Sequence, residues 1–537
     1  MRSRFILGFC ALSALAFVRC VGGDDSAATD GGNDSGNDVT VTDGAPEAAV
    51  DATADASADV EADAPRPVPK AVGDFDWAAS PDGVGGGPIA YDAQGNLFFA
   101  WQMYYDITFN GTTYTDAGTW DAILAKFDPT GKVLWVKQVG GTSSDQILAL
   151  ATDPAGDVYA TILTQSPTIS FGNNITYNKV GTNGDGLLVK LKGSDGTAVW
   201  LADYTPTGDN WLACGQLAYG GGRLGMSCWS YQQGIALTKD SDGSPLALSC
   251  LDCSGSDPEH HNIYVASINP ANGKAYWANV IAGDADTIPT SLAVDSKGAA
   301  VLAFASFADV VHDPTNTINW TYQGVKGAIA LIAKLASTNG AGIWFKQFTD
   351  GTTNNNNQTS PGQVAIDSND DVIFGGQIYG QVPFGTVTLK SAGNNDGFVT
   401  KLKGGFGDVI WALTFGGTGM DQGALVGVDA WDEVFVAQEC GSTDGKLGTM
   451  SFPAVPASHS GICIGKLDPS GTALWATGIV SSSASPGPWP YAGLAVDPSV
   501  GDVTVQGGFQ GTVDLGDGNP VTNKSAQEIE FVVTHNP

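Results

Sequence analysis

The chain has 537 residues, 72 of them glycine, and a formal net charge of -32 at pH 7. Nucleic acids and anionic lipid surfaces bind through clustered Lys and Arg, and the 24 basic residues form no such cluster, so both are excluded as partners. Charged residues are only 15% of the chain, and short apolar runs alternate with Gly, Asn, Asp and Pro clusters. This pattern is typical of many short strands joined by turns.

Residues 1–20 have the pattern of a secretory signal. Two arginines precede an apolar run, residues 5–18, that is too short to span a bilayer. The run leads to Cys20 and resembles the signals of bacterial lipoproteins, in which such a cysteine carries the lipid. Arg19 departs from the small residue usual before that cysteine, and residues 14–16 offer an alternative cleavage site that would release a soluble protein. The sequence predicts export, with lipidation at Cys20.

The segment after the signal is acidic and lacks a hydrophobic pattern. Residues 21–64 contain twelve Asp and Glu and no Lys or Arg. Such a segment cannot bury a core, so we predict that residues 21–69 form a disordered acidic tether. Residues 70–537 then make up the folded domain.

A tryptophan recurs at the end of a short apolar run that follows a Gly-containing turn, as in Gly196-Thr-Ala-Val-Trp200. An element that recurs at a fixed phase indicates a repeat architecture. The seven positions are Trp77, Trp135, Trp200, Trp277, Trp344, Trp411 and Trp475.

Three further strands are predicted in each repeat. A run such as Leu150 to Asp153 ends in a turn, a second strand follows, and a third strand ends in a lysine such as Lys126 before the tryptophan strand. The Asp carboxylate can accept backbone N–H groups two residues on, so these aspartates are turn formers first and metal ligands second. In the third repeat Tyr219 replaces the Asp and Ser267 replaces the Lys. Four antiparallel strands repeated radially predict an all-β fold, a β-propeller.

The two ends of the domain fix the closure of the ring. Residues 73–77 form a fourth strand without its first three, and residues 528–534 form a third strand without a fourth. Pairing them gives a seven-bladed propeller whose last blade is closed by the N-terminal strand, which removes an open sheet edge. A Phe-Gly-like turn between strands two and three, as at Ser170-Phe-Gly172, predicts a short extra hairpin in each blade.

The turn Asp-x-x-Gly, the run Lys466-Leu-Asp-Pro-Ser-Gly471 and the Trp-x-x-x-x-Gly-Gly ending resemble the bacterial β-propeller-repeat proteins of the SBBP type. The resemblance covers residues 70–537. It implies a secreted or cell-surface protein of unassigned activity, because these motifs build turns and inter-blade packing.

Two enzyme classes and a scaffold role are the alternatives to a binding protein. The turn-plus-tryptophan element also resembles quinoprotein dehydrogenases, but these generally have eight blades and often adjacent cysteines, which this chain lacks. A glycosidase or lyase needs paired carboxylates, and the sequence alone does not pair them. Similar propellers also serve as assembly scaffolds in the outer membrane. No catalytic residue and no cofactor is predicted, with zinc or calcium as the alternative.

Six cysteines remain after the signal, an even number suited to disulfides in an oxidising compartment. If Tyr219 lies opposite Arg223 across a Gly-rich turn, Cys214 lies opposite Cys228, which predicts that disulfide. In the sixth repeat, Cys440 lies late in strand two and Cys463 lies early in strand three, so these two cysteines are also expected to be neighbours. The predicted pairs are Cys214–Cys228, Cys440–Cys463 and Cys250–Cys253, and the alternative for the last is a zinc site of Cys250, Cys253, His260 and His261.

The predicted contact residues are aromatic side chains outside the repeat positions, because aromatic faces stack on sugars or anchor proteins. In an antiparallel blade the short turns lie on one rim, the short-turn rim, and the longer connections lie on the opposite, long-loop rim. Loops on a rigid scaffold carry binding residues, so we expect the protein to be an exported, lipid-anchored binding module that uses its long-loop rim to bind a protein or carbohydrate. The aromatic candidates are Trp211, Trp320, Trp489, Tyr105 and Tyr491.

Overall fold

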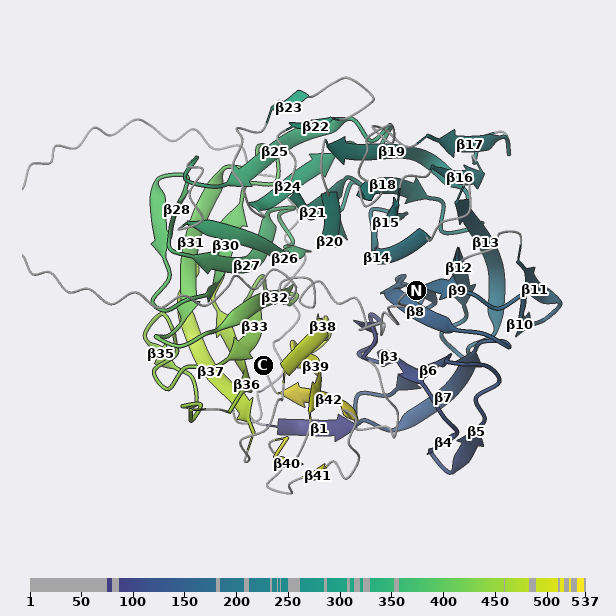
Figure 1. Cartoon of the computed structure of the whole chain (residues 1–537), viewed down its shortest axis with the longest axis horizontal. Helices are drawn as coiled ribbons and strands as arrows, with labels where there is room; N and C mark the ends of the chain where they lie inside the picture. Colours follow the sequence, from purple (N-terminus) through teal and green to yellow (C-terminus); the bar gives the residue numbers. More distant parts are fainter. Residues whose placement is uncertain are drawn as a thin grey trace, which may run out of the picture.

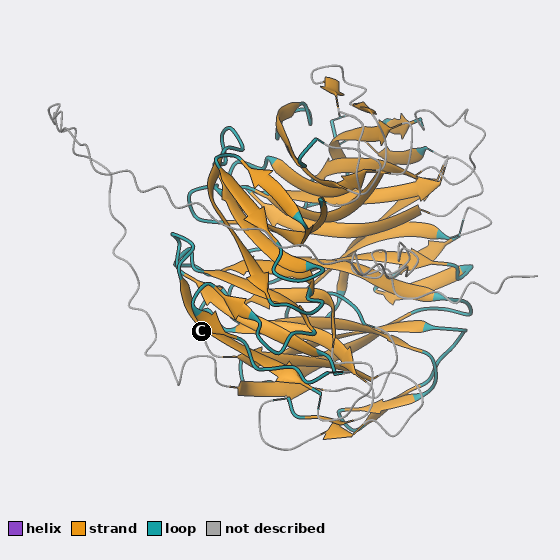
Figure 2. Ribbon diagram, turned by 60° about the vertical axis from the view of Figure 1, so that its left-hand side comes forward, coloured by secondary structure: helices purple, strands orange, loops and turns teal. Residues whose placement is uncertain are grey.

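The computed structural model describes residues 75–79, 86–179, 184–206, 212–231, 234–238, 240–241, 243–249, 261–283, 287–306, 310–312, 319–321, 329–351, 357–457, 459–481, 489–509, 512–515, 521–522 and 529–535. These residues form strands and turns, and none of them is in a helix (Figure 2). Within these ranges there is accordingly no helix long and apolar enough to cross a membrane. The predicted all-β class is confirmed.

Seven blades surround a central axis (Figure 1). Each blade is an antiparallel sheet whose first strand lies nearest the axis and whose fourth lies at the outside, which confirms the seven-bladed propeller. Blades 1 to 3 consist of β2 (Ile89–Tyr91), β3 (Leu97–Met103), β6 (Asp121–Phe127) and β7 (Val133–Val139); β8 (Asp145–Thr152), β9 (Val158–Thr164), β12 (Asp185–Leu191) and β13 (Ala198–Pro206); and β14 (Leu212–Gly220), β15 (Arg223–Tyr231), β18 (His261–Ile268) and β19 (Ala275–Gly283).

The remaining blades repeat the same order of strands. Blades 4 to 6 consist of β20 (Thr287–Val294), β21 (Ala300–Ser306), β24 (Ile329–Leu335) and β25 (Gly342–Phe348); β26 (Gln358–Ile366), β27 (Val372–Tyr379), β30 (Asp396–Leu402) and β31 (Val409–Gly416); and β32 (Gln422–Val428), β33 (Val434–Cys440), β36 (Gly461–Leu467) and β37 (Ala473–Val480). Blade 7 consists of β38 (Trp489–Val496), β39 (Val503–Phe509), β42 (Ile529–His535) and β1 (Phe75–Ala79).

Blade 7 closes the ring with the two ends of the domain, as predicted. β1 pairs with β42, with Trp77 opposite Thr534 and Phe75 opposite His535. On its other side β42 pairs with β39, and His535 lies opposite Val503, directly after the short turn that begins at Asp497. The chain therefore enters the propeller on the short-turn rim.

The predicted extra hairpin is present between strands two and three of every blade. Among the described residues, three hairpins pair with the outer strand of the preceding blade, as β16 does with β13 through Thr205 and Ala236, and β40 is bridged to Ser481 directly after β37. These contacts cover part of an otherwise open edge strand. The hairpins are β4 (Ile107–Phe109) with β5 (Thr112–Tyr114), β10 (Thr168–Gly172) with β11 (Ile175–Asn178), β16 (Ile235–Thr238) with β17 (Pro245–Leu248), β22 (Val310–His312) with β23 (Asn319–Thr321), β28 (Gln381–Phe384) with β29 (Val387–Lys390), β34 (Lys446–Leu447) with β35 (Met450–Ser451), and β40 (Thr512–Val513) with β41 (Val521–Thr522).

The core lies between neighbouring blades rather than inside any one of them. The second and third strands are the most deeply buried, and all seven residues of β3 and of β6 are buried. One cluster joins Val265 of blade 3 to Leu302 and Leu331 of blade 4. Each blade thus packs its apolar faces on its neighbours, at roughly 1.5–3 kcal/mol for each large buried side chain.

Candidate functional site

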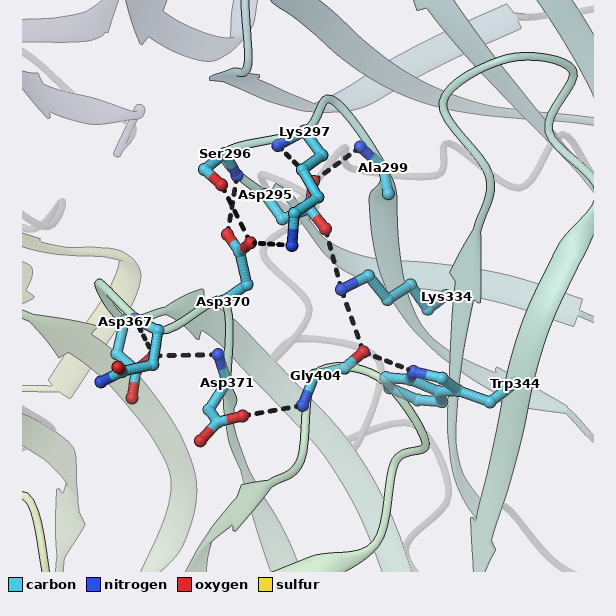
Figure 3. A network of polar contacts seen from close by, with 11 residues as sticks. Asp295, Ser296, Lys297, Ala299, Lys334, Trp344, Asp367, Asp370, Asp371 and Gly404 are labelled. Atoms are coloured by element: carbon cyan, nitrogen blue, oxygen red, sulfur yellow. Dashed lines mark hydrogen bonds and ion pairs between the residues drawn. The ribbon is translucent and has the colours of Figure 1, made fainter. Parts of the chain in front are cut away.

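The repeated turn aspartates lie on the short-turn rim, where they stabilise the turns. In blade 4, Asp295 Oδ1 accepts the backbone N–H groups of Lys297 (2.9 Å) and Ala299 (2.8 Å), and its Oδ2 lies 2.8 Å from Lys334 Nζ (Figure 3). Both charged side chains are almost fully buried. The turn-forming role is confirmed, and the repeated lysine is its ion-pair partner. The equivalent ion pairs are Asp92–Lys126, Asp153–Lys190, Asp367–Lys401 and Asp429–Lys466.

Among the described side chains, five of the repeated tryptophans donate a hydrogen bond to the following blade. Trp344 Nε1 donates to the carbonyl oxygen of Gly404 in blade 5 at 2.9 Å (Figure 3). Its ring packs on Gly407, which has φ +70° and where an added Cβ would lie 2.8 Å from the indole. Four other tryptophans donate to the same turn of the following blade: Trp135 to Gly193, Trp200 to Pro270, Trp277 to Ser337 and Trp411 to Pro469.

Blade 3 lacks both members of the ion pair. Tyr219 stands in place of the aspartate, and Ser267 stands in place of the lysine. A cation–π contact occurs here instead, because the Arg223 guanidinium lies 4.2 Å from the centre of the Tyr276 ring. Blade 7 differs again, because it keeps the buried aspartate, Asp497, while Thr534 takes the place of the lysine opposite Trp77, and burial raises the pKa of Asp497.

A cavity of about 180 Å³ lies on the central axis and is lined by the first strand of all seven blades. Its side chains are neutral and mostly small or apolar, with amides and hydroxyls from Gln216, Ser291, Gln363 and Gln377. The carboxylates of the repeated turns are not part of this lining. The cavity therefore offers hydrogen bonds and apolar contacts, with no charged group.

β-bulges in the inner strands shape this cavity. Six first strands change register near the axis, for example β8 between Ile147 and Ala149. A bulge leaves backbone groups without ladder partners. Two backbone N–H groups of the first strands are bonded from the preceding blade, because Ser291 Oγ accepts from Val364 N (3.0 Å) and Gln363 Oε1 accepts from Val426 N (3.1 Å). The bulges thus shape the cavity and link neighbouring blades.

Two pairs of buried aspartates lie on the long-loop rim, where the chain passes between blades. Asp121 and Asp145 lie at the passage from blade 1 to blade 2, and Asp396 and Asp421 lie at the passage from blade 5 to blade 6. Burial, with Asp421 close by, raises the pKa of Asp396 to about 6, and burial raises the pKa of Asp121. In each pair the carboxylates accept backbone N–H groups of their own loops, so they anchor those loops.

Two predicted disulfides are present. Cys214 is bonded to Cys228, and Cys440 is bonded to Cys463, with Cα atoms 5.9 Å apart in the second pair. The register assumed for the first pair is wrong at its tip, where Gly220 rather than Tyr219 lies opposite Arg223. A bulge between Ala213 and Gln216 shifts the strand by one residue and restores the alignment of the cysteines.

Five of the other ten predicted site residues lie outside the described residues: Cys20, Cys250, Cys253, His260 and Trp211. His261 begins β18 and is buried, with its ring edge-to-face against Trp229. Trp320, Trp489 and Tyr491 belong to β23 and β38, but their side chains are outside the described set. In the described part of the chain, no three His, Cys, Asp or Glu side chains gather as a metal site. The predicted zinc and calcium alternatives stay untested.

Tyr105 lies on the long-loop rim just after β3, with 46% of its surface exposed. Sequence reasoning missed a tryptophan on the same rim, Trp120, which precedes β6 and packs edge-to-face on Tyr104 at 5.2 Å between ring centres. The signal for Trp120 was available. Residues 117–121, Ala-Gly-Thr-Trp-Asp, and residues 392–396, Ala-Gly-Asn-Asn-Asp, share their first two residues and their last. They differ at the tryptophan and at the residue before it.

No protein-family model matches the chain, and a comparison with curated proteins finds no match. Solved structures do match over most of the chain. The quinohemoprotein alcohol dehydrogenase from Comamonas testosteroni is 11% identical, with 86% of this chain and 76% of that chain covered and a TM-score of 0.34. BamB from Moraxella catarrhalis is 11% identical over 87% of this chain and 98% of its own, at TM-score 0.33. The phage phi92 endosialidase is 7% identical over 86% and 69%, at TM-score 0.37. Similarity at this level carries no argument about activity.

Proposed function

We propose that this protein is an exported, lipid-anchored, non-enzymatic binding module that takes a protein or carbohydrate ligand on its long-loop rim. The observation that carries the proposal is the neutral lining of the axial cavity. The charged residues of the repeats form buried pairs between strands and turns, as Lys334 does with Asp295. The central surfaces of the ring therefore favour hydrogen bonding and apolar contact with a ligand.

The path of the chain supports this orientation. β1 starts on the short-turn rim, so a tether from Cys20 would join the propeller at that rim. The long-loop rim would then point away from the membrane. Exposed aromatic side chains occur on both rims, Tyr105 on the long-loop rim and Phe406, 72% exposed, in a short turn of blade 5.

Two measurements on the full chain test the proposal. Cys20→Ser should move the protein from the membrane fraction to the medium if the lipid anchors it. For binding, the parent chain and two matched variants would be used to capture ligands from a cell-envelope extract. Tyr105→Glu should weaken capture, while Phe406→Glu should leave it unchanged. Equal loss in both variants, or conversion of the captured material to a product, would contradict a binding module that works through the long-loop rim.

A further inference from the structure

The passages from blade 1 to blade 2 and from blade 5 to blade 6 use the same backbone scaffold. Asp145 N donates to Trp120 O at 2.8 Å, and at the second passage Asp421 N donates to Asn395 O at 2.9 Å. The loop N–H of Gly141 donates to Asp145 Oδ2 (2.8 Å), as that of Gly417 does to Asp421 (2.7 Å).

The hydroxyl contacts of the two scaffolds also match. Ser143 N donates to Ser166 Oγ at 2.9 Å, and Gly419 N donates to Ser442 Oγ at 2.8 Å. Each serine hydroxyl in turn donates to the aspartate of the same copy, Ser166 to Asp145 and Ser442 to Asp421. The two passages are therefore structural copies, and a difference in their side chains is not required by the scaffold.

Side chains differ between the two copies at several aligned positions, including Leu163 with Glu439. At four further positions the first copy has aromatic, amide or hydroxyl side chains, while the second copy has small, amide or flexible residues. The strand registers Met103 with Asp121 and Ile378 with Asp396 set the alignment. The aligned pairs are Tyr105 with Gly380, Trp120 with Asn395, Ser144 with Met420, and Gln165 with Gly441.

A small hollow lies among three of these side chains on the first copy, and Tyr105, on the same rim, is not part of its lining. It is lined by Trp120 and Ser144, by Leu163 and by three glutamines, Gln102, Gln146 and Gln165. Its volume is about 20 Å³, enough for one water-sized group. The hollow can therefore hold a single hydroxyl, with the rest of a ligand lying across the exposed surface.

The polar groups that line this hollow are complementary to a polyhydroxylated, uncharged ligand. Each glutamine amide supplies both donors and an acceptor, and the Tyr104 hydroxyl fixes Gln102 by donating to its Oε1 at 3.0 Å. Asp145, which also borders the hollow, already accepts from Gly141 N and from the Ser166 and Thr164 hydroxyls. The net charge of -32 further disfavours an anionic ligand.

Trp120 is held in place before any ligand arrives. Its backbone bridges to Ser144, its carbonyl oxygen accepts from Asp145 N, and its ring packs edge-to-face on Tyr104. A rigid aromatic side chain loses little conformational entropy on binding. We propose that Trp120, Tyr105 and the three glutamines form a subsite for a neutral oligosaccharide, in which a sugar ring lies against the aromatic side chains and one of its hydroxyls enters the hollow. This rests on the proposed binding function and names its ligand class.

The test uses the full chain, titrated by calorimetry with cellohexaose, mannohexaose and chitohexaose, and with a galacturonic acid hexamer as the anionic counterpart. At least one neutral hexasaccharide should bind, and the anionic one should not. Trp120→Asn and Tyr105→Gly, which install the residues of the second copy, should each weaken binding by about tenfold. Met420→Ala, an exposed side chain of the second copy, should change nothing.

Because Asn and Gly already stand in the second copy, both variants should keep the parent's thermal unfolding curve, and that curve is measured alongside. The carbohydrate assignment is overturned if no neutral hexasaccharide binds, or if Trp120→Asn binds as tightly as the parent. If the sugars fail while Tyr105→Glu still abolishes capture from the cell-envelope extract, the binding module stands and only the ligand class is wrong.

Discussion

Lys334 and Trp344 lie opposite each other on neighbouring strands of blade 4, and both donate to the carbonyl oxygen of Gly404 in blade 5, at 3.0 and 2.9 Å (Figure 3). One acceptor in the next blade thus fixes two side chains of this one. The same lysine is also paired with Asp295 in its own blade. Turn conformation, strand pairing and the contact between blades are therefore stabilised together.

The buried ion pairs predict a large effect when only one partner is removed. In blade 5, Lys401 Nζ lies 2.6 Å from Asp367 Oδ2, and both side chains are less than a tenth exposed. Lys401→Met should lower the free energy of unfolding by about 3–5 kcal/mol, because it leaves a buried carboxylate without its counter-charge. Urea denaturation measures the loss.

The control for that change is the neighbouring Lys403, whose side chain is 58% exposed and 3.3 Å from Asp371. Lys403→Met should cost no more than about 1 kcal/mol. Blade 3 lacks both charges, so adding Asp367→Asn to Lys401→Met should recover part of the loss. A double variant less stable than Lys401→Met would contradict this account.

The packing of tryptophan on glycine predicts a position-specific effect of alanine. Gly340 has φ +69°, and an added Cβ would lie 2.5 Å from the Trp277 ring, whereas Gly111 has φ +75° and open space around it. Gly111→Ala should cost about 1–2 kcal/mol for the left-handed backbone alone. Gly340→Ala should lower the free energy of unfolding by about 1–3 kcal/mol more than Gly111→Ala does, because the Trp277 ring must move. Equal losses in denaturation midpoint would show that the contact between blades contributes little.

The blade pattern was predictable because it depends on local signals. The turn aspartate, the positive-φ glycine and the tryptophan recur at fixed spacing, so seven blades and their closure by β1 and β42 follow from counting. The pairing of β16 with β13 was not predictable, since it joins the hairpin of one blade to the outer strand of another. Such a contact depends on blade geometry, which no single repeat encodes.

The functional surfaces were predictable only in part. Tyr105 stood out because it falls outside the repeat positions, and it is exposed on the long-loop rim. Trp120 was missed because no single repeat distinguishes it, and only a comparison of residues 117–121 with residues 392–396 shows that Asn395 takes its place. The Cys214–Cys228 pairing was predicted from a register that is wrong by one residue at the hairpin tip. The pairing is nevertheless present, because a bulge that was not predicted shifts the strand back by one residue.

The disulfide between Cys440 and Cys463 should stabilise blade 6. It closes a loop with a sequence separation of 23 and links strands two and three near the long-loop rim. Replacing both cysteines by alanine should lower the free energy of unfolding by about 3 kcal/mol, mainly because the unfolded chain regains freedom. Thermal unfolding of the double variant measures this, and the parent treated with reductant after unfolding is the matched control. A stability equal to the parent's would be the contrary result.

The aspartate pair between blades 5 and 6 predicts a pH dependence with a definite sign. Burial, with Asp421 close by, raises the pKa of Asp396 to about 6 from an ordinary value of 3.8. The folded protein therefore binds this proton more tightly than the unfolded chain does. Stability contributed by Asp396 is present at low pH and is lost as the pH rises from about 4 to about 6.

Asp396→Asn should remove that loss, because the amide cannot ionise and can donate a hydrogen bond to Asp421. At pH 7 the variant should be more stable than the parent by about 1 kcal/mol, after discounting for solvent screening, and at pH 4 the two should be equal. Asp444 is the control of opposite sign, because the backbone N–H of Thr418 lowers its pKa. Its contribution is lost as the pH falls, so Asp444→Asn should be less stable than the parent at pH 7. Denaturation midpoints across pH 4–7 decide the matter, and an Asp396→Asn variant that tracks the parent at every pH would show that Asp396 is ionised in the folded protein throughout this range.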